Sequence, residues 1–273
     1  MIVSRRTLLL GAAATALAGC SSDGPDEGGR AAGSRVDGSF VSQRRGGVPT
    51  GWTIVYPPGH ATERSRAGLP VLLALHGAGG DHQWPVRTLY LDRLLAGTVA
   101  GGAAPFAIAT VDGGHRKYWH PRRTGDPAAM VFDEFLPLLA DHGLDTRRIG
   151  LIGWSMGGYG ALYLASLLGP RRCAVAVAVS PAIWVHSYQV AAGSFDDAAD
   201  FRAHGLWGRL SRLAGIPLRV DCGASDGFAP ATRRLRSLLR PTPAGALTPG
   251  AHKAAYWRGQ APAELAFAAR HLA

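Results

Sequence analysis

The stretch from Arg148 to Gly160 constrains the fold of this chain more than any other part of its sequence. Residues 148–152 form a short apolar run typical of a buried strand, residues 153–157 read Gly-Trp-Ser-Met-Gly and fit G-x-S-x-G, and residues 158–168 predict a helix. So tight a turn forces Ser155 into a strained backbone conformation, which requires glycine at positions 153 and 157. The pattern therefore predicts a nucleophile elbow that lifts the Ser155 hydroxyl out at the carboxyl edge of a sheet.

Two backbone N–H groups are candidates for an oxyanion hole. Met156 opens the helix after the elbow, so its N–H has no partner within the helix and lies at the positive end of the helix dipole. The second candidate is Ala78, with Gly79 next, in the loop His76-Gly77-Ala78-Gly79-Gly80. This loop follows an apolar run and matches the H-G-x-G-G loop of α/β-hydrolases. A tight turn or a phosphate-binding loop is the alternative, but no G-K-[ST] follows.

The rest of the chain alternates expected strands with expected helices. Strands are expected at residues 39–43, 52–56, 70–75, 105–111, 148–152, 174–179 and 217–222, and helices at 84–95, 127–142, 158–168, 230–239 and 256–272. We expect an α/β-hydrolase fold with a mostly parallel central sheet, helices on both faces and an antiparallel edge made by the first two strands. In the second helix, Asp133 and Glu134 are interpreted as a solvated face. Residues 181–216 are interpreted as an insertion that caps the pocket.

A serine nucleophile needs a base to accept its proton and a carboxylate to orient that base. In α/β-hydrolases the chain order is serine, acid, histidine. Four histidines follow Ser155, namely His186, His204, His252 and His271. Only His252 lies on a glycine-flanked loop between an acidic strand-end loop and the last helix. The aspartates between Ser155 and His252 are Asp196, Asp197, Asp200, Asp221 and Asp226, and only Asp226 follows directly after a core strand. The order therefore predicts Ser155, Asp226 and His252 as the triad.

Aromatic residues near the expected site are candidates for substrate binding. Tyr118 and Trp119 lie in a loop at the same sheet edge as Ser155, and Trp154 precedes the nucleophile. We expect these three side chains to bind an acyl or aryl group, the alternative being that the loop pair anchors a long loop in the core. Asp112, His115 and His120 in the same loop are weighed as metal ligands, but neutral or solvated histidines are the preferred interpretation, and neither a metal nor a cofactor is expected.

The first 38 residues predict export rather than catalysis. Arg5 and Arg6 form a twin arginine, which favours twin-arginine export over general export. They precede an apolar segment, Leu8 to Ala18, which is too short to span a membrane. The residues Leu17-Ala18-Gly19-Cys20 resemble a bacterial lipobox, which implies a signal peptide over residues 1–19 and a lipid on Cys20. A plain signal peptide with an incidental cysteine is the alternative. Residues 20–38 are interpreted as a disordered tether, which leaves residues 39–273 as the catalytic domain.

The charge of the chain limits the choice of partners. Its 29 Lys and Arg against 19 Asp and Glu give a formal charge of +10, which suits a protein held against an anionic envelope or membrane. The arginines are scattered in pairs without interleaved aromatic residues, so nucleic-acid binding is not expected. Cys173 and Cys222 fall in or beside expected strands and are interpreted as small buried residues rather than a disulfide.

From about Ser39 to its end, the chain resembles the putative-esterase family of α/β-hydrolases, which includes esterase D (S-formylglutathione hydrolase), feruloyl esterases and the antigen 85 mycolyltransferases. The matching segments are 75–77, 112–113, 132–137, 153–162, 180–181, 223–226 and 250–252. The resemblance implies the same triad, Ser155, Asp226 and His252. The sequence departs from many members at Lys253, where an acidic residue often follows the histidine.

These inferences predict an exported, lipid-anchored serine esterase that hydrolyses small-molecule or lipid esters through an acyl-serine intermediate. One alternative is acyl transfer to envelope sugars or lipids, since water and an alcohol attack the same intermediate. Another is a non-catalytic envelope-binding protein on a hydrolase scaffold.

Overall fold

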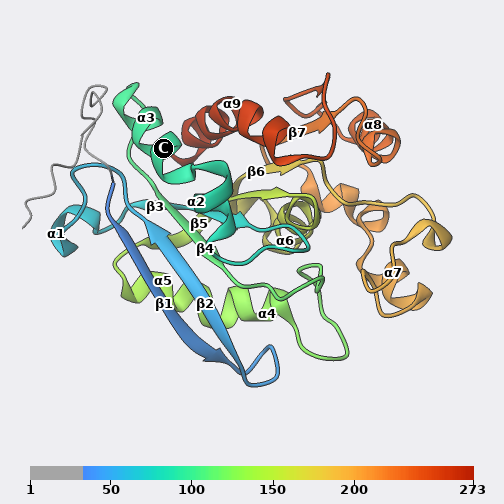
Figure 1. Ribbon diagram of the computed structural model, residues 1–273, viewed down its shortest axis with the longest axis horizontal. Helices are drawn as coiled ribbons and strands as arrows, with labels where there is room; N and C mark the ends of the chain where they lie inside the picture. Colours follow the sequence, from blue (N-terminus) through green and yellow to red (C-terminus); the bar gives the residue numbers. More distant parts are fainter. Residues whose placement is uncertain (1–32) are drawn as a thin grey trace, which may run out of the picture. The chain divides into compact units, whose positions relative to one another are not determined.

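An eight-stranded sheet runs through residues 33–273, the part of the chain that the computed structural model describes (Figure 1). Its strand order is β1-β2-β4-β3-β5-β6-β7-β8. The strands are β1 (Arg35–Ser42), β2 (Val48–Val55), β3 (Pro70–Leu75), β4 (Ala107–Val111), β5 (Asp145–Trp154), β6 (Cys173–Val179), β7 (Leu218–Gly223) and β8 (Leu247–Thr248). From β4 to β8 every neighbouring pair is parallel, so the carboxyl ends of these strands share one edge.

The hairpin of β1 and β2 forms the antiparallel edge of the sheet, as the sequence predicts. One boundary differs from the expectation. The first strand begins at Arg35, so residues 35–38 pair with β2 and belong to the sheet rather than to the tether. The side chain of Asp37 accepts hydrogen bonds from Arg35 within β1 and from Thr53 of β2, so one polar side-chain contact joins the two strands of this edge.

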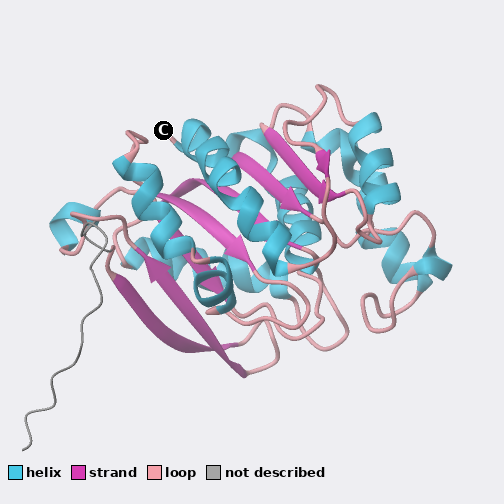
Figure 2. Cartoon of the chain, turned by 45° about the horizontal axis from the view of Figure 1, so that its top comes forward, coloured by secondary structure: helices cyan, strands magenta, loops and turns pink. Residues whose placement is uncertain are grey.

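Helices cover both faces of the sheet (Figure 2). One face packs against α2 (Trp84–Leu89), α3 (Leu91–Ala100) and α9 (Ala254–Leu272). The other packs against α4 (Pro127–Met130), η1 (Val131–Phe135), α5 (Leu136–Asp141) and α6 (Met156–Arg172). The remaining helices are α1 (Glu63–Arg66), η2 (Ser187–Gln189), α7 (Ala198–His204), η3 (Leu206–Leu213) and α8 (Ala229–Leu238). The expected α/β-hydrolase architecture is confirmed.

Two expected helices are less regular than their periodicity indicates. The helix expected at 84–95 breaks at Tyr90, which has φ 57° and separates α2 from α3. The helix expected at 127–142 widens into a π turn at η1. Pro137 has no N–H to donate to the carbonyl four residues earlier, so the regular α ladder is interrupted there.

The interpretation of Glu134 as part of a solvated face is wrong. Its carboxylate accepts hydrogen bonds from the Ser42 hydroxyl at 2.5 Å, from the N–H of Gln43 at 2.8 Å and from the N–H of Arg44 at 3.0 Å. These donors form the β1–β2 turn, so Glu134 fastens the edge hairpin to the helix layer. Helical periodicity places Glu134 outside the apolar stripe, but it cannot show that a distant turn covers that position.

Cys173 and Cys222 are buried free thiols, as expected from the sequence. Burial raises the pKa of Cys173 to about 12 and that of Cys222 to about 11, so both stay as neutral thiols. Over residues 33–273, no helix has the length and apolarity that crossing a membrane requires.

Candidate active site

The turn between β5 and α6 has the geometry of a nucleophile elbow. Ser155 has φ 57° and ψ −116°, a conformation that is strained for any residue with a side chain. A Cβ on Gly157 would collide with the carbonyl oxygen of Leu75, and one on Gly153 would collide with Gly157. The backbone of Ser155 is held on both sides, because its N–H donates to Val179 and its carbonyl accepts from Ala182, each at 2.9 Å.

Three side chains from different parts of the chain meet at this elbow. The Ser155 hydroxyl donates to Nε2 of His252 at 2.9 Å, and Nδ1–H of the same ring donates to Oδ2 of Asp226 at 2.7 Å. This arrangement fixes the histidine tautomer, since the nitrogen that faces the serine carries the lone pair. The imidazole is about one-third exposed, whereas the carboxylate is fully buried.

The environment of Asp226 keeps its carboxylate ionised. Burial alone raises the pKa of a carboxyl group, but hydrogen bonds from His252 and from the N–H of Phe228 lower the pKa of Asp226 below its ordinary value. Asp221, the neighbouring aspartate, has a different role. Its buried carboxylate is paired with Arg219 at 2.6 Å and accepts the N–H of Ala246.

The glycine-rich loop after β3 lies against the nucleophile. A Cβ added to Gly77 would lie 3.7 Å from Cβ of Ser155, an ordinary van der Waals distance, so this loop lies directly beside the nucleophile. His76 fixes the loop from beneath, since its Nδ1 donates to the Gly77 carbonyl at 2.8 Å and its Nε2 accepts the N–H of Gly113 at 3.0 Å. Burial lowers the pKa of His76, which keeps this ring neutral.

The two oxyanion candidates flank this contact. Met156 is the first residue of α6, where the N–H groups lack partners within the helix, and Ala78 directly follows Gly77. The carbonyl of Ala78 accepts the N–H of Arg116, which holds the peptide between Ala78 and Gly79. Both residues therefore lie at the elbow, and their role as oxyanion donors stays a prediction.

The aromatic residues expected to bind substrate are mostly core residues. Trp154 and Trp119 are fully buried, and Tyr118 is only 6% exposed. Trp119 packs against Gly113 and Gly160, where even a methyl group would collide with its ring. Both tryptophans therefore lie in the core of this structure, and their contact with substrate stays a prediction. The sequence places both next to the site, but it cannot reveal that positive φ angles at Tyr118 and Trp119 turn the loop inward.

Other aromatic rings reach the triad from the loop after β7 and from the inserted segment. Phe228 contacts His252 with ring centroids 5.3 Å apart, and Trp184 contacts Phe228 at 5.5 Å. Trp184 also contacts Tyr118 at 5.7 Å, so the insertion begins beside the triad. Sequence reasoning missed Phe228 and Trp184, although both lie just beyond strand ends at the active edge of the sheet.

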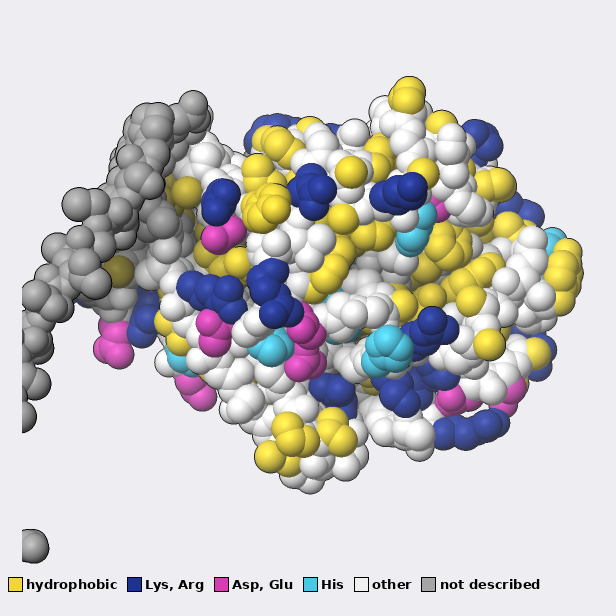
Figure 3. Space-filling view, viewed as in Figure 1, with side chains coloured by type: hydrophobic (Ala, Val, Ile, Leu, Met, Phe, Trp, Pro, Cys, Tyr) yellow, Lys and Arg dark blue, Asp and Glu magenta, His cyan; other side chains and the backbone are white. Residues whose placement is uncertain are grey.

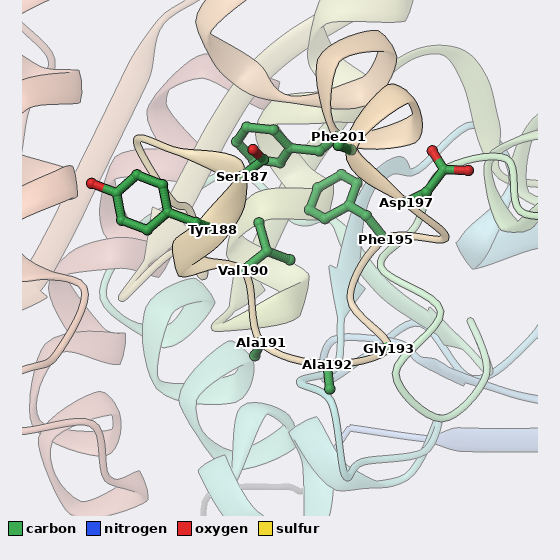
Figure 4. A pocket seen from close by; sticks show the side chains of 10 residues that line it. Ser187, Tyr188, Val190, Ala191, Ala192, Gly193, Phe195, Asp197 and Phe201 are labelled. Carbon is green, nitrogen blue, oxygen red and sulfur yellow. The ribbon is translucent and has the colours of Figure 1, made fainter.

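Arg122, in the loop that follows β4, holds the insertion in place. Arg122 donates to Asp196 at 2.8 Å and to the carbonyl groups of Gly193 and Ser194 at 3.1 Å each. This segment encloses a cavity of about 380 Å³. Its lining residues are drawn in Figure 4, namely Ser187, Tyr188, Val190, Ala191, Ala192, Gly193, Phe195, Asp197, Ala198 and Phe201. No triad residue lines this cavity, so it is separate from the reacting groups.

The three residues weighed as metal ligands, Asp112, His115 and His120, have different surroundings. Asp112 binds His82, His115 is exposed, and His120 is buried beside the insertion. His120 instead approaches Asp200 and His204, and burial lowers the pKa of His120 to about 4. Arg122 lies 3.8 Å from Asp200, so a cation already neutralises that carboxylate.

Positive charges are scattered over the visible face of the protein, as the sequence predicts. Figure 3 shows Lys and Arg side chains spread over the visible face among acidic and apolar groups rather than gathered into one stripe. The predicted twin arginine, signal peptide, lipobox cysteine Cys20 and most of the tether lie outside the described residues.

Comparisons with known proteins indicate the family of the chain. The family model described as Putative esterase matches residues 48–268. Among solved structures, the chain is similar to a ferulic acid esterase, with a TM-score of 0.75 and 18% identity over 89% of this chain and 99% of the other. It is also similar to an S-formylglutathione hydrolase from Staphylococcus aureus (TM-score 0.71, 16% identity, 87% and 99%) and to MPT51 from Mycobacterium tuberculosis (TM-score 0.66, 18% identity, 85% and 97%). No curated protein matches.

Proposed function

Because the chain belongs to the putative esterase family of carboxylic ester hydrolases, we propose that it is an exported, lipid-anchored esterase in which Ser155 is the nucleophile, His252 the base and Asp226 the orienting acid. The observation that carries the proposal is the unbroken series of hydrogen bonds from Ser155 through His252 to Asp226. A non-catalytic binding protein would have no need of a strained serine aligned with a histidine of fixed tautomer.

The reaction follows from this geometry. His252 accepts the hydroxyl proton through Nε2 as Ser155 Oγ attacks the ester carbonyl, and the N–H groups of Met156 and Ala78 bind the oxyanion. The same imidazolium then gives its proton to the leaving alcohol, which leaves an acyl group on Ser155. His252 next deprotonates a water molecule, whose attack releases the acid and restores the serine. Asp226 stays ionised throughout and stabilises the imidazolium.

Acyl transfer is the second candidate, because an alcohol can replace water in the last step. The exposed third of His252 leaves its ring open to either acceptor. The two reactions share all steps up to the acyl-enzyme, so they are distinguished by what attacks it. The proposed lipid anchor at Cys20 would hold the domain close to membrane lipids and to envelope sugars, which offer hydroxyl groups as acceptors.

A fluorophosphonate probe tests the proposed nucleophile. We expect the probe to label Ser155 alone in the wild type, and Ser155→Ala to abolish both labelling and hydrolysis of p-nitrophenyl esters while circular dichroism stays unchanged. Labelling or hydrolysis that persists in a folded Ser155→Ala variant would place the chemistry elsewhere. Product analysis over a series of acyl chain lengths, with and without an added alcohol, separates hydrolysis from transfer.

A further inference from the structure

The glycine-rich loop after β3 is held to the end of β4 at both of its own ends. The strands β3 and β4 are parallel neighbours, so the segments that follow them leave the sheet at the same edge. At the near end of the loop, Nε2 of His76 accepts the N–H of Gly113 at 3.0 Å. At the far end, His82 is bound by the side chain of Asp112. Ala78, a proposed oxyanion donor, lies between these two anchors.

Asp112 binds His82 through one carboxylate oxygen. Its Oδ1 accepts the backbone N–H of His82 at 2.6 Å and Nδ1–H of the same residue at 2.9 Å. Its Oδ2 accepts the N–H of Gly51 at 3.0 Å, so β2 takes part in the same anchor. Burial alone would raise the pKa of Asp112, but these hydrogen bonds from His82 and Gly51 lower it below its ordinary value. The carboxylate is therefore charged at neutral pH and accepts all three bonds.

The position of His82 is also fixed by its other contacts. The Thr110 hydroxyl, within β4, donates to the His82 carbonyl. The imidazole lies over Gly51, where even a methyl group would collide with the ring. Only 18% of the His82 side chain is exposed. The far end of the loop therefore has a defined place against β2 and β4.

The proposed oxyanion donor lies in a turn between the two anchors. The N–H of Gly80 donates to the Gly77 carbonyl at 3.0 Å, which closes a four-residue turn with Ala78 and Gly79 at its centre. Such a turn does not use the N–H groups of its central residues, and that of Ala78 makes no backbone hydrogen bond within residues 33–273. The direction of this N–H relative to Ser155 therefore depends on where the ends of the loop are held.

We propose that Asp112 and His82 are positioning residues of this esterase, which together hold the glycine-rich loop so that the Ala78 N–H meets the oxyanion. The proposal rests on the proposed function, in which Ser155 attacks an ester and Ala78 binds the oxyanion. Donors to an oxyanion contribute most when they are held in place before the reaction, because the protein then does not have to reorient them. Asp112 and His82 act through the loop rather than by contact with the substrate.

The first test replaces Asp112 by asparagine. The amide keeps one oxygen but presents its nitrogen to an N–H donor, so at least one of the bonds to His82 and Gly51 is lost. We expect kcat for p-nitrophenyl acetate to fall about tenfold to thirtyfold while KM stays within about twofold, because the loop acts on the transition state. Removal of a whole oxyanion donor costs about 10² to 10³ in kcat, so a misdirected donor should cost less.

Two variants at His82 separate the hydrogen bond from the packing. His82→Asn loses the ring but keeps an N–H donor at the place of Nδ1, whereas His82→Leu keeps bulk over Gly51 but loses the donor. We expect His82→Asn to keep kcat within about threefold of the wild type and His82→Leu to lose about tenfold. The reverse order would mean that the ring holds the loop by packing, which overturns the role given to Asp112.

A transition-state analogue gives a readout that a merely structural role would not change. An alkyl trifluoromethyl ketone adds to a serine nucleophile and forms an oxyanion. Its Ki should therefore rise in Asp112→Asn and His82→Leu by about the factor by which kcat/KM falls. Loss of folded protein would instead lower the number of sites that a fluorophosphonate titrates, and would leave Ki and kcat per titrated site unchanged. That second outcome would overturn the proposal.

The matched control is Asp126→Asn. The side chain of Asp126, in the same connection between β4 and the helix layer, accepts the N–H of Ala129 at the start of α4. Asparagine caps a helix as well as aspartate does, so this variant removes one charge but should leave kcat and Ki unchanged.

The variants also separate this inference from the proposed function. Wild-type kcat and Ki in folded Asp112→Asn and His82→Leu would overturn the inference. If Asp112→Asn does not fold, the comparison of the two His82 variants decides it. Should Ser155→Ala keep its activity, the triad itself fails, whereas an inactive Ser155→Ala beside a fully active Asp112→Asn removes only this inference.

Discussion

Oδ2 of Asp226 lies 2.7 Å from Nδ1 of His252, whereas the carboxylate of Asp221, five residues earlier in the same strand and loop, is paired with Arg219. The difference arises from position along β7. Asp221 lies within the strand and is buried there, while Asp226 lies beyond the carboxyl end, where loops from neighbouring strands meet. Two aspartates of similar sequence context therefore have separate roles.

Replacing each aspartate by asparagine tests this separation. Asp226→Asn should lower kcat at least about a hundredfold, because an amide favours the wrong histidine tautomer, and serine proteases lose about 10⁴ from this change. Asp221→Asn should cost less than about tenfold in a folded protein, since its carboxylate does not contact the histidine. Steady-state kinetics with circular dichroism as the folding check measures both. If Asp221→Asn instead lowers kcat more than Asp226→Asn does, Asp226 is not the acid of the triad.

Lipidation of Cys20 predicts where the protein is found in cells. Wild-type protein expressed with its own leader in a bacterial host should partition with membranes, and Cys20→Ala should move it to the soluble fraction. Fractionation with immunoblotting, together with mass spectrometry of the mature N-terminus, provides the measurement. Wild-type protein recovered fully soluble with an unmodified N-terminus would contradict the lipoprotein assignment but would leave the esterase assignment intact.

Asp200 is expected to hold the insertion in place. Its buried carboxylate accepts the N–H of Asp196 at 2.7 Å and Nδ1–H of His204 at 2.6 Å, with Arg122 close by. Asp200→Asn leaves the arginine without its full counter-charge and should lower the free energy of unfolding by about 2 kcal/mol in urea denaturation. Asp145→Asn is the matched control. It breaks an ion pair with the highly exposed Arg147 and should change stability little.

The order of chemical groups along the chain predicts the triad candidates, because parallel strands place their following loops at one edge. Ser155, Asp226 and His252 each follow directly from this rule, and so does the sheet from β3 to β7. Orientation does not follow from order. Trp119 and Trp154 border the site in sequence but point into the core, since side-chain direction depends on backbone angles that a loop sequence does not specify.

Long-range pairing is the other part that the sequence leaves open. The bond between Trp257 and Ser180 joins residues 77 positions apart, and those from Glu134 to the β1–β2 turn join residues 90 to 92 apart. Neither Trp257 nor Glu134 stands out in its local sequence. A tryptophan in α9 and a glutamate outside the apolar stripe of residues 127–142 both fit ordinary helical periodicity. Only the packing of α9 and η1 on the sheet creates these contacts.

Glu264 is a buried carboxyl group without a hydrogen-bonding side chain to bind it. It lies on α9 with no exposed surface, and neither carboxyl oxygen has a hydrogen-bond partner within residues 33–273. Burial, with a smaller contribution from the nearby charge of Asp221, raises the pKa of Glu264 well above 4.5, against an opposing effect of Arg219. The folded state therefore binds a proton more tightly at this position than the unfolded chain does.

This shift predicts how stability depends on pH. When the pKa of a carboxyl group is higher in the folded state than in the unfolded state, the folded protein is most stable below the unfolded pKa, near 4.5. This stability is lost as the pH rises from the unfolded pKa through the folded pKa. Glu264 should therefore cost the wild type about 1.4 kcal/mol for each pH unit between those two values. Glu264→Gln cannot ionise, so its free energy of unfolding relative to the wild type should rise between pH 5 and pH 8. Urea denaturation at both pH values measures this difference, with the exposed Glu63→Gln as control. Parallel pH dependence in the wild type and Glu264→Gln would show that Glu264 finds a charged partner or solvent in the folded protein.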